Sequence, residues 1–158
     1  MIRILFVCLG NICRSPMAEA VLRRKVVQSG AADRIEVDSA GTGGWHIGSL
    51  PHPGTRKVLD KAGVSWTGIH ARRVTRQDFD HFDLLVAMDR ENEADLLALA
   101  GPDERRRQKV RRFMEFLDDR KGRDVPDPYY SGNFDRVYRL IDEGTDRLLR
   151  LVLKNRIS

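Results

Sequence analysis

Residues 7–15, with the sequence VCLGNICRS, place a cysteine and an arginine at a spacing that suits phosphate chemistry. Five residues separate Cys8 from Arg14, and a loop of that length can curl its main-chain N–H groups inward around an anion. The helix expected to follow adds the positive end of its dipole. Arg14 presents a planar fork of donors that can hold two phosphate oxygens at once. The spacing therefore predicts a phosphate bound over Cys8.

These surroundings favour the thiolate form of Cys8, because the N–H groups, Arg14 and the helix end all stabilise negative charge. A thiolate that attacks phosphorus in line forms a cysteinyl-phosphate, which divides hydrolysis into two easier displacements. The alternative is that Cys8 is simply a small apolar residue at a strand end, as most buried cysteines are. Arg14 argues against that alternative, since a guanidinium at a helix start is a costly neighbour without an anion.

Other uses of this loop fit the sequence less well. Gly10 is its single glycine, whereas the G-x-x-x-x-G-K-[ST] and G-x-G-x-x-G nucleotide-binding loops need more. Cys8 and Cys13 supply only two zinc ligands, and the four histidines of the chain show no ligand-pair spacing. The four residues between the cysteines exclude a C-x-x-C motif but leave a slower, reversible disulfide open. We therefore expect no metal and no other cofactor.

A general acid is still required, and the segment DVPDPYYSG at residues 124–132 is the best source of one. Pro126 and Pro128 hold Asp127 in an extended loop with little conformational freedom to lose. Tyr129 and Tyr130 follow directly, and such a pair can wall a flat aromatic substrate. The alternative is an acidic turn with two aromatic residues at its edge.

The elements that must position these residues alternate between apolar runs and helix signals. The near-continuous apolar run at residues 2–7 is typical of a strand buried on both faces of a parallel sheet. A helix should follow, capped by Ser15, with Pro16 in its first turn and Gly30 at its end. Further strands are predicted at 34–42, 82–88 and 110–116, and further helices at 55–63, 90–100 and from 133 onward.

This alternation predicts an α/β fold with an open, mostly parallel sheet covered by helices on both faces. Ligands of such sheets bind outside the carboxyl ends of the strands, which is where the loop after residue 8 begins. The length of 158 residues suits one domain spanning residues 1–158. No apolar run is long enough to span a membrane, and two cysteines cannot form a secreted disulfide framework. We therefore expect a cytoplasmic protein.

The net charge of +5 comes largely from the basic run ERRRQKVRR at residues 104–112. A charge run without interleaved aromatic residues is typical of a solvated face. A surface for RNA or an acidic protein is the alternative.

Taken with the DPYY segment at 127–130, the loop makes the chain resemble the low-molecular-weight protein tyrosine phosphatases. VCLGNICRSPMAEA resembles the active-site signature of that family, and VDSAGTGGWHIG, DFDHFDLLVAMD and VPDPYY resemble its other stretches in the expected order. The resemblance implies a four-stranded parallel sheet flanked by helices, with the phosphate-binding loop between the first strand and the first helix. No metal is implied.

The resemblance also implies the roles of individual residues. Cys8 would be the nucleophile, Arg14 would hold the phosphate, and Asp127 would act as acid and then as base for the attacking water. The substrate would be bound by Leu9, Gly10, Asn11, Ile12, Cys13, Ser15, Trp45, Tyr129 and Tyr130.

A polar network implied by the family would support this loop. Asn11 would fix the loop, Ser39 would support Asn11, and Ser15 would hydrogen-bond the thiolate. The family usually has a histidine in an H-x-A-R segment here, but His70 of this chain stands one place late. Either the loop slips so that His70 still reaches Asn11, or that hydrogen bond is absent.

Two loop residues bear on substrate and regulation within the family. Relatives resembling phosphoarginine phosphatases carry threonine at the position of Ile12, so isoleucine favours phosphotyrosine. Cys13 resembles a resolving residue that traps oxidised Cys8 as a disulfide, with plain loop packing as the alternative. The arsenate-reducing relatives need further cysteines, which this chain lacks.

The function expected from the sequence is hydrolysis of phosphotyrosine in proteins, which a cognate tyrosine kinase would have phosphorylated. Phosphoarginine hydrolysis and a non-catalytic phosphate- or RNA-binding module are the alternatives. We expect a monomer or weak dimer that associates with neither membranes nor nucleic acid.

Overall fold

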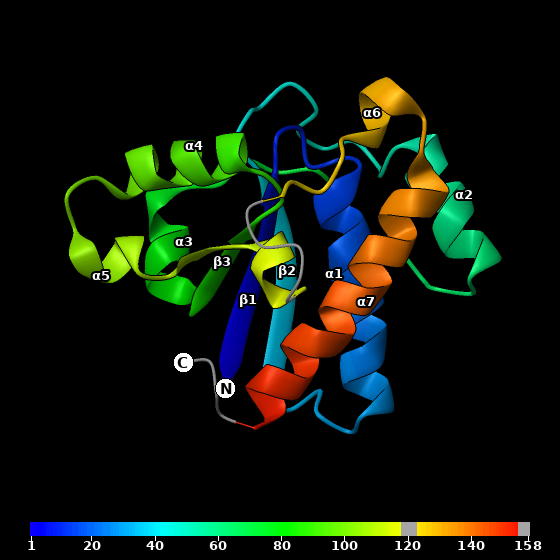
Figure 1. Ribbon diagram of the computed structural model, residues 1–158, viewed down its shortest axis with the longest axis horizontal. Helices are drawn as coiled ribbons and strands as arrows, with labels where there is room; N and C mark the ends of the chain where they lie inside the picture. Colours follow the sequence, from blue (N-terminus) through cyan, green and yellow to red (C-terminus); the bar gives the residue numbers. More distant parts are fainter. Residues whose placement is uncertain (118–122, 155–158) are drawn as a thin grey trace.

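Four short strands form one sheet in the structure, a computed structural model that describes residues 1–117 and 123–154 (Figure 1). They are β1 (Ile2–Cys8), β2 (Ile35–Gly41), β3 (Leu84–Ala87) and β4 (Val110–Arg112). Their order is β2-β1-β3-β4, and every neighbouring pair is parallel. The predicted four-stranded parallel sheet is confirmed, with the apolar run at its centre. The predicted domain at 1–158 also includes residues 118–122 and 155–158, which lie outside the described residues.

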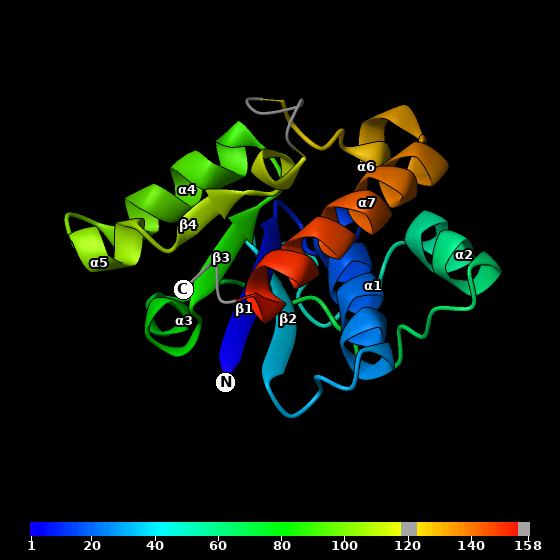
Figure 2. The ribbon, with the colours of Figure 1, turned by 60° about the horizontal axis from the view of Figure 1, so that its bottom comes forward.

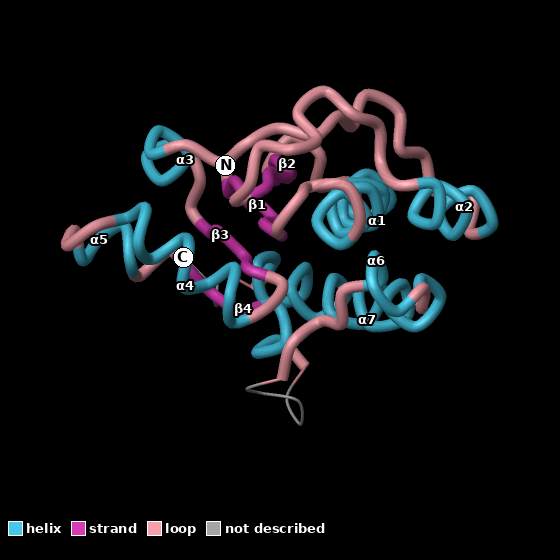
Figure 3. Tube along the Cα trace, turned by 90° about the horizontal axis from the view of Figure 1, so that it is seen from above, coloured by secondary structure: helices cyan, strands magenta, loops and turns pink. Residues whose placement is uncertain are grey.

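Helices cover both faces of this sheet, as the strand-helix alternation predicts (Figure 3). One face carries α1 (Arg14–Gln28) and α7 (Phe134–Leu153), which lie side by side in Figures 1 and 2. The other face carries α3 (Arg76–His81) and α4 (Arg90–Ala100). The shorter elements are α2 (Pro53–Lys61), α5 (Glu104–Arg107), the 3₁₀ helix η1 (Phe113–Phe116) and α6 (Pro128–Ser131).

The alternating side chains of β1 supply both halves of the core. Ile4 and Phe6 pack into the cluster shared with α1 and α7, whereas Leu5 and Val7 pack into the cluster shared with α3 and α4. Each of these four side chains is at most 1% exposed. A strand apolar on both faces must lie between two helical layers, which fixes β1 at the centre and its carboxyl end at the middle of the sheet edge.

The fourth strand is shorter than the sequence predicts. The expected strand at 110–116 ends at Arg112, and the chain turns into η1. The carboxylate of Glu115 accepts from the main-chain N–H of Arg112 at 2.7 Å, which closes the turn. Phe113 and Phe116 are both buried, as the apolar sequence of this segment predicts. A buried apolar segment need not be extended, however.

The first helix also begins differently from the prediction. Cys13 occupies its N-cap position without a side-chain cap, and Ser15 lies inside the helix rather than capping it. The expected end is confirmed, because Gly30 adopts a φ of 70°, a left-handed conformation that favours glycine.

The carboxyl ends of β1 and β3 meet at one edge of the sheet, where the loop after Cys8 and the start of α4 lie close together (Figure 1). The loop after β2 and the segment before α6 approach the same edge. Among residues 1–117 and 123–154, no helix combines the length and the apolar character needed to cross a membrane.

Candidate active site

The loop between β1 and α1 is held in shape by Asn11. Asn11 has a φ of 55°, the one non-glycine residue in the left-handed region among those described, and asparagine tolerates that region better than most residues. Its amide nitrogen donates to Ser15 Oγ at 2.8 Å and to Ser39 Oγ at 3.0 Å. Its amide oxygen accepts from the main-chain N–H of Arg72 at 2.9 Å. The loop is thus fixed to α1, to β2 and to the segment before α3.

Gly10 is not the left-handed residue of the loop, although it is the loop's single glycine; that residue is Asn11. At Gly10 a Cβ atom would lie 3.1 Å from Cδ2 of His46, a contact tighter than most side chains tolerate. Glycine is needed here because the loop after β2 approaches closely.

Cys8 ends β1 and is only 3% exposed. Its Sγ lies 2.9 Å from Oγ of Ser15. Because the Ser15 hydroxyl already accepts from Asn11, its own proton is available to the sulfur.

Arg14 is fixed behind the loop by two carboxylates. Its Nη1 donates to Asp89 at 2.7 Å and to the carbonyl oxygen of Val125 at 3.0 Å, and its Nη2 lies 3.5 Å from Asp127. Burial by itself would lower the pKa of Arg14, but the charges of Cys8, Asp89 and Asp127 together raise it, so the guanidinium stays charged.

The third nitrogen of that guanidinium, Nε, indicates what kind of ligand the site can bind. Nε of Arg14 is buried and has no hydrogen-bond acceptor among the described residues. A buried donor without an acceptor costs about 1–3 kcal/mol. An anion in the pocket that Arg14 lines would supply such an acceptor.

Asp89 is the residue here that sequence reasoning missed. It is the N-cap of α4, where one carboxylate oxygen accepts from the N–H of Asn92 at 2.7 Å and the other holds Arg14. Arg14 therefore has a carboxylate partner of its own chain, which the sequence did not identify. The position of Asp89 directly after a buried strand, at the edge where Cys8 lies, was the signal that could have found it.

A cavity of about 240 Å³ opens above the loop. Its lining residues are Cys8, Leu9, Gly10, Ile12, Cys13, Arg14, Trp45, His46, Asp127, Tyr129 and Tyr130. Asn11, Ser15 and Ser39, the other predicted site residues, lie beneath the loop and support it. His46 lines the cavity and was not predicted.

Aromatic side chains form the mouth of this cavity. Trp45, Tyr129 and Tyr130 are between 54% and 78% exposed, which is unusual for side chains of this size. The rings of Tyr129 and Tyr130 meet edge to face, with their centroids 5.3 Å apart. A planar aromatic group entering the cavity would pass between these walls.

Asp127 stands at the same mouth. It is the N-cap of α6, where one carboxylate oxygen accepts from the N–H of Tyr129 at 3.1 Å and the other lies 3.5 Å from Arg14. Its backbone is extended, as expected for a residue between two prolines. Its side chain is one quarter exposed, so a proton on it can reach both the cavity and solvent.

Cys13 differs from Cys8 in its electrostatic surroundings. Both cysteines are free and buried. Burial raises the pKa of the Cys13 thiol to about 12, and the nearby charges of Cys8 and Asp127 add to the rise. Cys13 is therefore a neutral thiol under ordinary conditions, and its disulfide with Cys8 stays a prediction.

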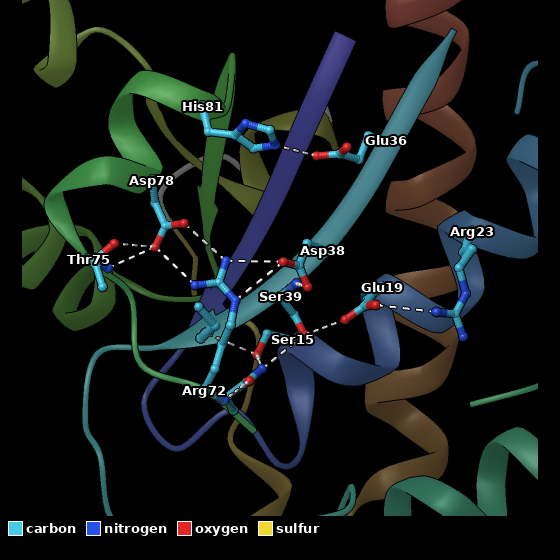
Figure 4. A network of polar contacts seen from close by, with 12 residues as sticks. Ser15, Glu19, Arg23, Glu36, Asp38, Ser39, Arg72, Thr75, Asp78 and His81 are labelled. Carbon is cyan, nitrogen blue, oxygen red and sulfur yellow. Dashed lines mark hydrogen bonds and ion pairs between the residues drawn. The ribbon is translucent and has the colours of Figure 1, made fainter. Parts of the chain in front are cut away.

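A polar network continues from the loop into the protein (Figure 4). Ser39 accepts from Asn11 and donates its own proton to the carboxylate of Glu19 at 2.6 Å. Glu19 is 6% exposed and lies 3.5 Å from Arg23. Glu19 was not among the site residues predicted from the sequence, so its link to the loop was missed.

Arg72 is the second unpredicted member of this network. Its guanidinium binds Asp38 and Asp78, each at 3.1 Å, while its main-chain N–H serves Asn11 (Figure 4). The question left open for His70 is answered here. His70 is exposed, and the amide oxygen of Asn11 is taken by a main-chain group instead.

Residues 3–157 match the sequence model of the family described as low molecular weight phosphotyrosine protein phosphatase. The chain belongs to this family. The resemblance noted in the sequence is confirmed, and so is the expected class of enzyme.

Individual relatives match along almost their whole length. The chain is 47% identical over 156 residues to the low molecular weight protein-tyrosine-phosphatase YfkJ of Bacillus subtilis, covering 99% of both chains. The crystal structure of YfkJ matches with a TM-score of 0.94 and 48% identity, covering 98% of this chain and 96% of that one. A protein tyrosine phosphatase from Entamoeba histolytica with Hepes in its active site matches with a TM-score of 0.90 and 35% identity, covering 99% of each. A Drosophila arginine phosphatase, DARP, matches with a TM-score of 0.85 and 33% identity, covering 93% of this chain and 95% of that one.

Glu19 makes the stability of the protein depend on pH. Burial, reinforced by Asp38, raises its pKa from 4.5 to about 7 even though Ser39 and Arg23 oppose the shift. Between these values the folded protein holds a proton that the unfolded chain releases, so the free energy of unfolding falls as pH rises. From pH 5.5 to pH 8 this loss amounts to about 2 kcal/mol.

We expect Glu19→Gln to remove that part of the pH dependence, because glutamine keeps the acceptor for Ser39 without a titrating proton. Urea denaturation of both proteins at pH 5.5 and pH 8 measures it. Equal pH slopes in the two proteins would show that Glu19 does not ionise in this range.

Proposed function

We propose that this phosphatase hydrolyses phosphotyrosine through a cysteinyl-phosphate intermediate, without a metal ion. The observation that carries the proposal is a single cavity lined both by the Cys8 thiol and by Arg14, whose buried Nε lacks an acceptor among the described residues. A phosphate placed there would supply the acceptor and would lie over the sulfur. In the described part of the chain, no group of three or more histidine, cysteine, aspartate or glutamate side chains is arranged to hold a metal.

In the first step the Cys8 thiolate attacks phosphorus opposite the tyrosyl oxygen. The phosphorus–sulfur bond forms as the phosphorus–oxygen bond breaks, and Asp127 gives its proton to the departing tyrosyl oxygen. Main-chain N–H groups of the loop and Arg14 stabilise the charge on the remaining phosphate oxygens. The rigid attachment of Arg14 to Asp89 holds its donors in place before the substrate arrives.

In the second step Asp127, now a carboxylate, takes a proton from water. The water oxygen attacks phosphorus, the phosphorus–sulfur bond breaks, and inorganic phosphate leaves with Cys8 again a thiolate. Ser15, 2.9 Å from the sulfur, stabilises the departing thiolate in this step.

The aromatic mouth favours an aryl phosphate over other phosphate esters. Trp45, Tyr129 and Tyr130 can contact both faces and the edge of a phenyl ring, which an aliphatic phosphoserine would not fill. Phosphoarginine is the second candidate, because the matching Drosophila protein is described as an arginine phosphatase. Ile12, which lines the cavity, favours phosphotyrosine, since an apolar side chain offers no acceptor to a guanidinium.

The proposed substrates are cytoplasmic proteins phosphorylated on tyrosine by a partner kinase. The basic run at 104–112 lends little support to nucleic acid binding. Arg106, Arg111 and Arg112 each lie within 4 Å of a carboxylate of the chain itself. Arg107 donates to two main-chain carbonyl oxygens at 3.1 Å. These contacts favour a solvated face of the fold.

Cys8→Ser should abolish hydrolysis of an aryl phosphate, because a serine hydroxyl is a far weaker nucleophile in this setting. The near-equal size of the side chain should leave the fold intact, which circular dichroism checks. The unaltered protein should keep its full rate in the presence of a chelator. Undiminished turnover by the variant would overturn the mechanism, whereas phosphate binding without turnover by the unaltered protein would indicate a non-catalytic module.

Asp127→Asn tests the general acid. Loss of the proton donor should slow poor leaving groups such as a tyrosyl oxygen by about 10²- to 10⁴-fold. A good leaving group such as p-nitrophenolate needs less protonation, so its cleavage should be affected less. Single-turnover rates on the two substrates measure the difference, and an equal loss on both would remove Asp127 from that role.

Substrate class is decided by a direct comparison. We expect a phosphotyrosine peptide to be turned over with a higher kcat/KM than phosphoarginine and phosphoserine peptides of otherwise identical sequence. Ile12→Thr is the informative variant, because it changes one lining residue of the cavity and should move selectivity toward phosphoarginine. Preference of the unaltered protein for phosphoarginine would replace the first candidate with the second.

A further inference from the structure

A second hollow, here called the flanking groove, opens beside the catalytic cavity. It has a volume of about 1000 Å³ and is lined, among others, by Leu9, Trp45, Ile47, Arg73, Arg76 and Asp95. These residues come from the loop after β1, the loop after β2, the segment around the start of α3, and α4. In Figure 1 the loop after β2 stands between α4 and α6, so the flanking groove lies on the α4 side of that loop.

The flanking groove adjoins the catalytic cavity. Leu9 and Trp45 line both hollows. The indole of Trp45 folds back over the main chain of Gly43, where a Cβ atom would overlap the ring. Trp45 therefore forms a wall whose two sides face different ligand positions.

Arg73 is held at the floor of the flanking groove. Its main chain forms a parallel bridge with Gly41 at the end of β2. The residues before and after Arg73, Arg72 and Val74, each form a main-chain hydrogen bond with Gly41 at 2.8 Å. Its side chain runs along Gly44, with Cδ and Nη1 3.6 and 3.9 Å from where a Cβ of Gly44 would be. The guanidinium is thus directed along the loop that carries Trp45.

The charge of Arg73 and Arg76 is not neutralised by any described residue of the protein. Neighbouring Arg72 is bound by Asp38 and Asp78, so those carboxylates are already engaged. Among the residues that the structure describes, no carboxylate lies within ion-pair distance of Arg73 or Arg76. Asp95 on α4 is the single acidic side chain lining the groove, which leaves it with an excess of positive charge.

We propose that the flanking groove binds the residues next to phosphotyrosine in a protein substrate, and that Arg73 and Arg76 select an acidic side chain there. The inference rests on the proposed function, since it concerns the substrate residues on either side of the phosphotyrosine that the cavity would bind. An extended peptide advances about 3.3 Å per residue, so side chains one to three positions from phosphotyrosine can enter a hollow that shares a wall with the cavity. Ile47, which is 64% exposed, offers an apolar contact beside the charged pair.

The test uses phosphotyrosine peptides with glutamate, alanine or lysine at the three positions before or after phosphotyrosine, and a variant carrying both Arg73→Glu and Arg76→Glu. Arg76 begins α3, where a glutamate suits the helix dipole, and the Arg73 side chain is exposed, so the fold should tolerate both changes. Arg105→Glu is the control, because it makes the charge change of one of the two substitutions at an exposed arginine that lines neither hollow.

We expect the unaltered protein to favour glutamate over lysine on one side of phosphotyrosine by about fivefold to tenfold in kcat/KM at low salt. The double variant should reverse that preference, while Arg105→Glu should keep it. Hydrolysis of p-nitrophenyl phosphate, which does not reach the groove, should be the same in all three proteins. Raising the salt concentration should weaken the preference, because the charges are exposed.

Equal rates on glutamate and lysine peptides in the unaltered protein would overturn the flanking groove as an acidic subsite. An equal loss of preference in Arg105→Glu would also overturn it, since net charge alone would then explain the effect. In both cases p-nitrophenyl phosphate is still hydrolysed and the proposed function stands. Failure of the unaltered protein to hydrolyse p-nitrophenyl phosphate would instead overturn the proposed function and the subsite with it.

Discussion

The amide of Asn11 is the contact on which the geometry of the site depends. A loop of five residues has too little backbone to be rigid by itself, and the left-handed φ of Asn11 is unfavourable for a residue with a side chain. Three hydrogen bonds offset this cost: the side chain of Asn11 donates to Ser15 and Ser39 and accepts from the main-chain N–H of Arg72. Because each partner belongs to a different segment, the loop can hold its shape only when α1, β2 and the residues before α3 are all in place.

Two arginines near the loop, Arg14 and Arg72, are both held by carboxylates of the protein, but their guanidinium groups are used differently. Arg14 is fixed by Asp89 through one nitrogen, which leaves its Nε directed elsewhere. The guanidinium of Arg72 is instead bound by two carboxylates, and the contact of Arg72 with the loop is made by its main-chain N–H. The same type of residue therefore serves as a ligand-binding group in one position and as a structural anchor in the other.

Much of this structure could be predicted from the sequence, because local signals carried it. A stretch of a few residues is enough to recognise the apolar run of β1, the cysteine–arginine spacing and the proline-flanked Asp127. The errors arose where local chemistry allows two outcomes. Ser15 is a good N-cap residue, but its hydroxyl bonds Asn11 and Cys8 instead. Phe113 and Phe116 suit a strand as well as a buried 3₁₀ turn.

Residues brought together only by the fold were beyond sequence reasoning. His46 reaches the cavity and Asp89 reaches Arg14 from segments more than thirty residues away from the loop, and the main-chain N–H of Arg72 carries no sequence signal at all. Because His70 is one place later than the family's usual histidine, the sequence left open whether a hydrogen bond to Asn11 was absent. The structure satisfies Asn11 with a backbone N–H group, which any residue type except proline would provide at that position.

The double attachment of Asp89 couples anion binding to the folding of α4. One oxygen of its carboxylate caps the start of the helix and the other holds Arg14, so fraying of the first turn of α4 would remove one of the contacts that hold the guanidinium. Linkage then requires the reverse effect, in which an oxyanion bound by Arg14 makes that helical turn harder to open. Occupancy of the cavity is in this way communicated to the far side of the sheet, through a single carboxylate shared between a helix end and a ligand-binding side chain.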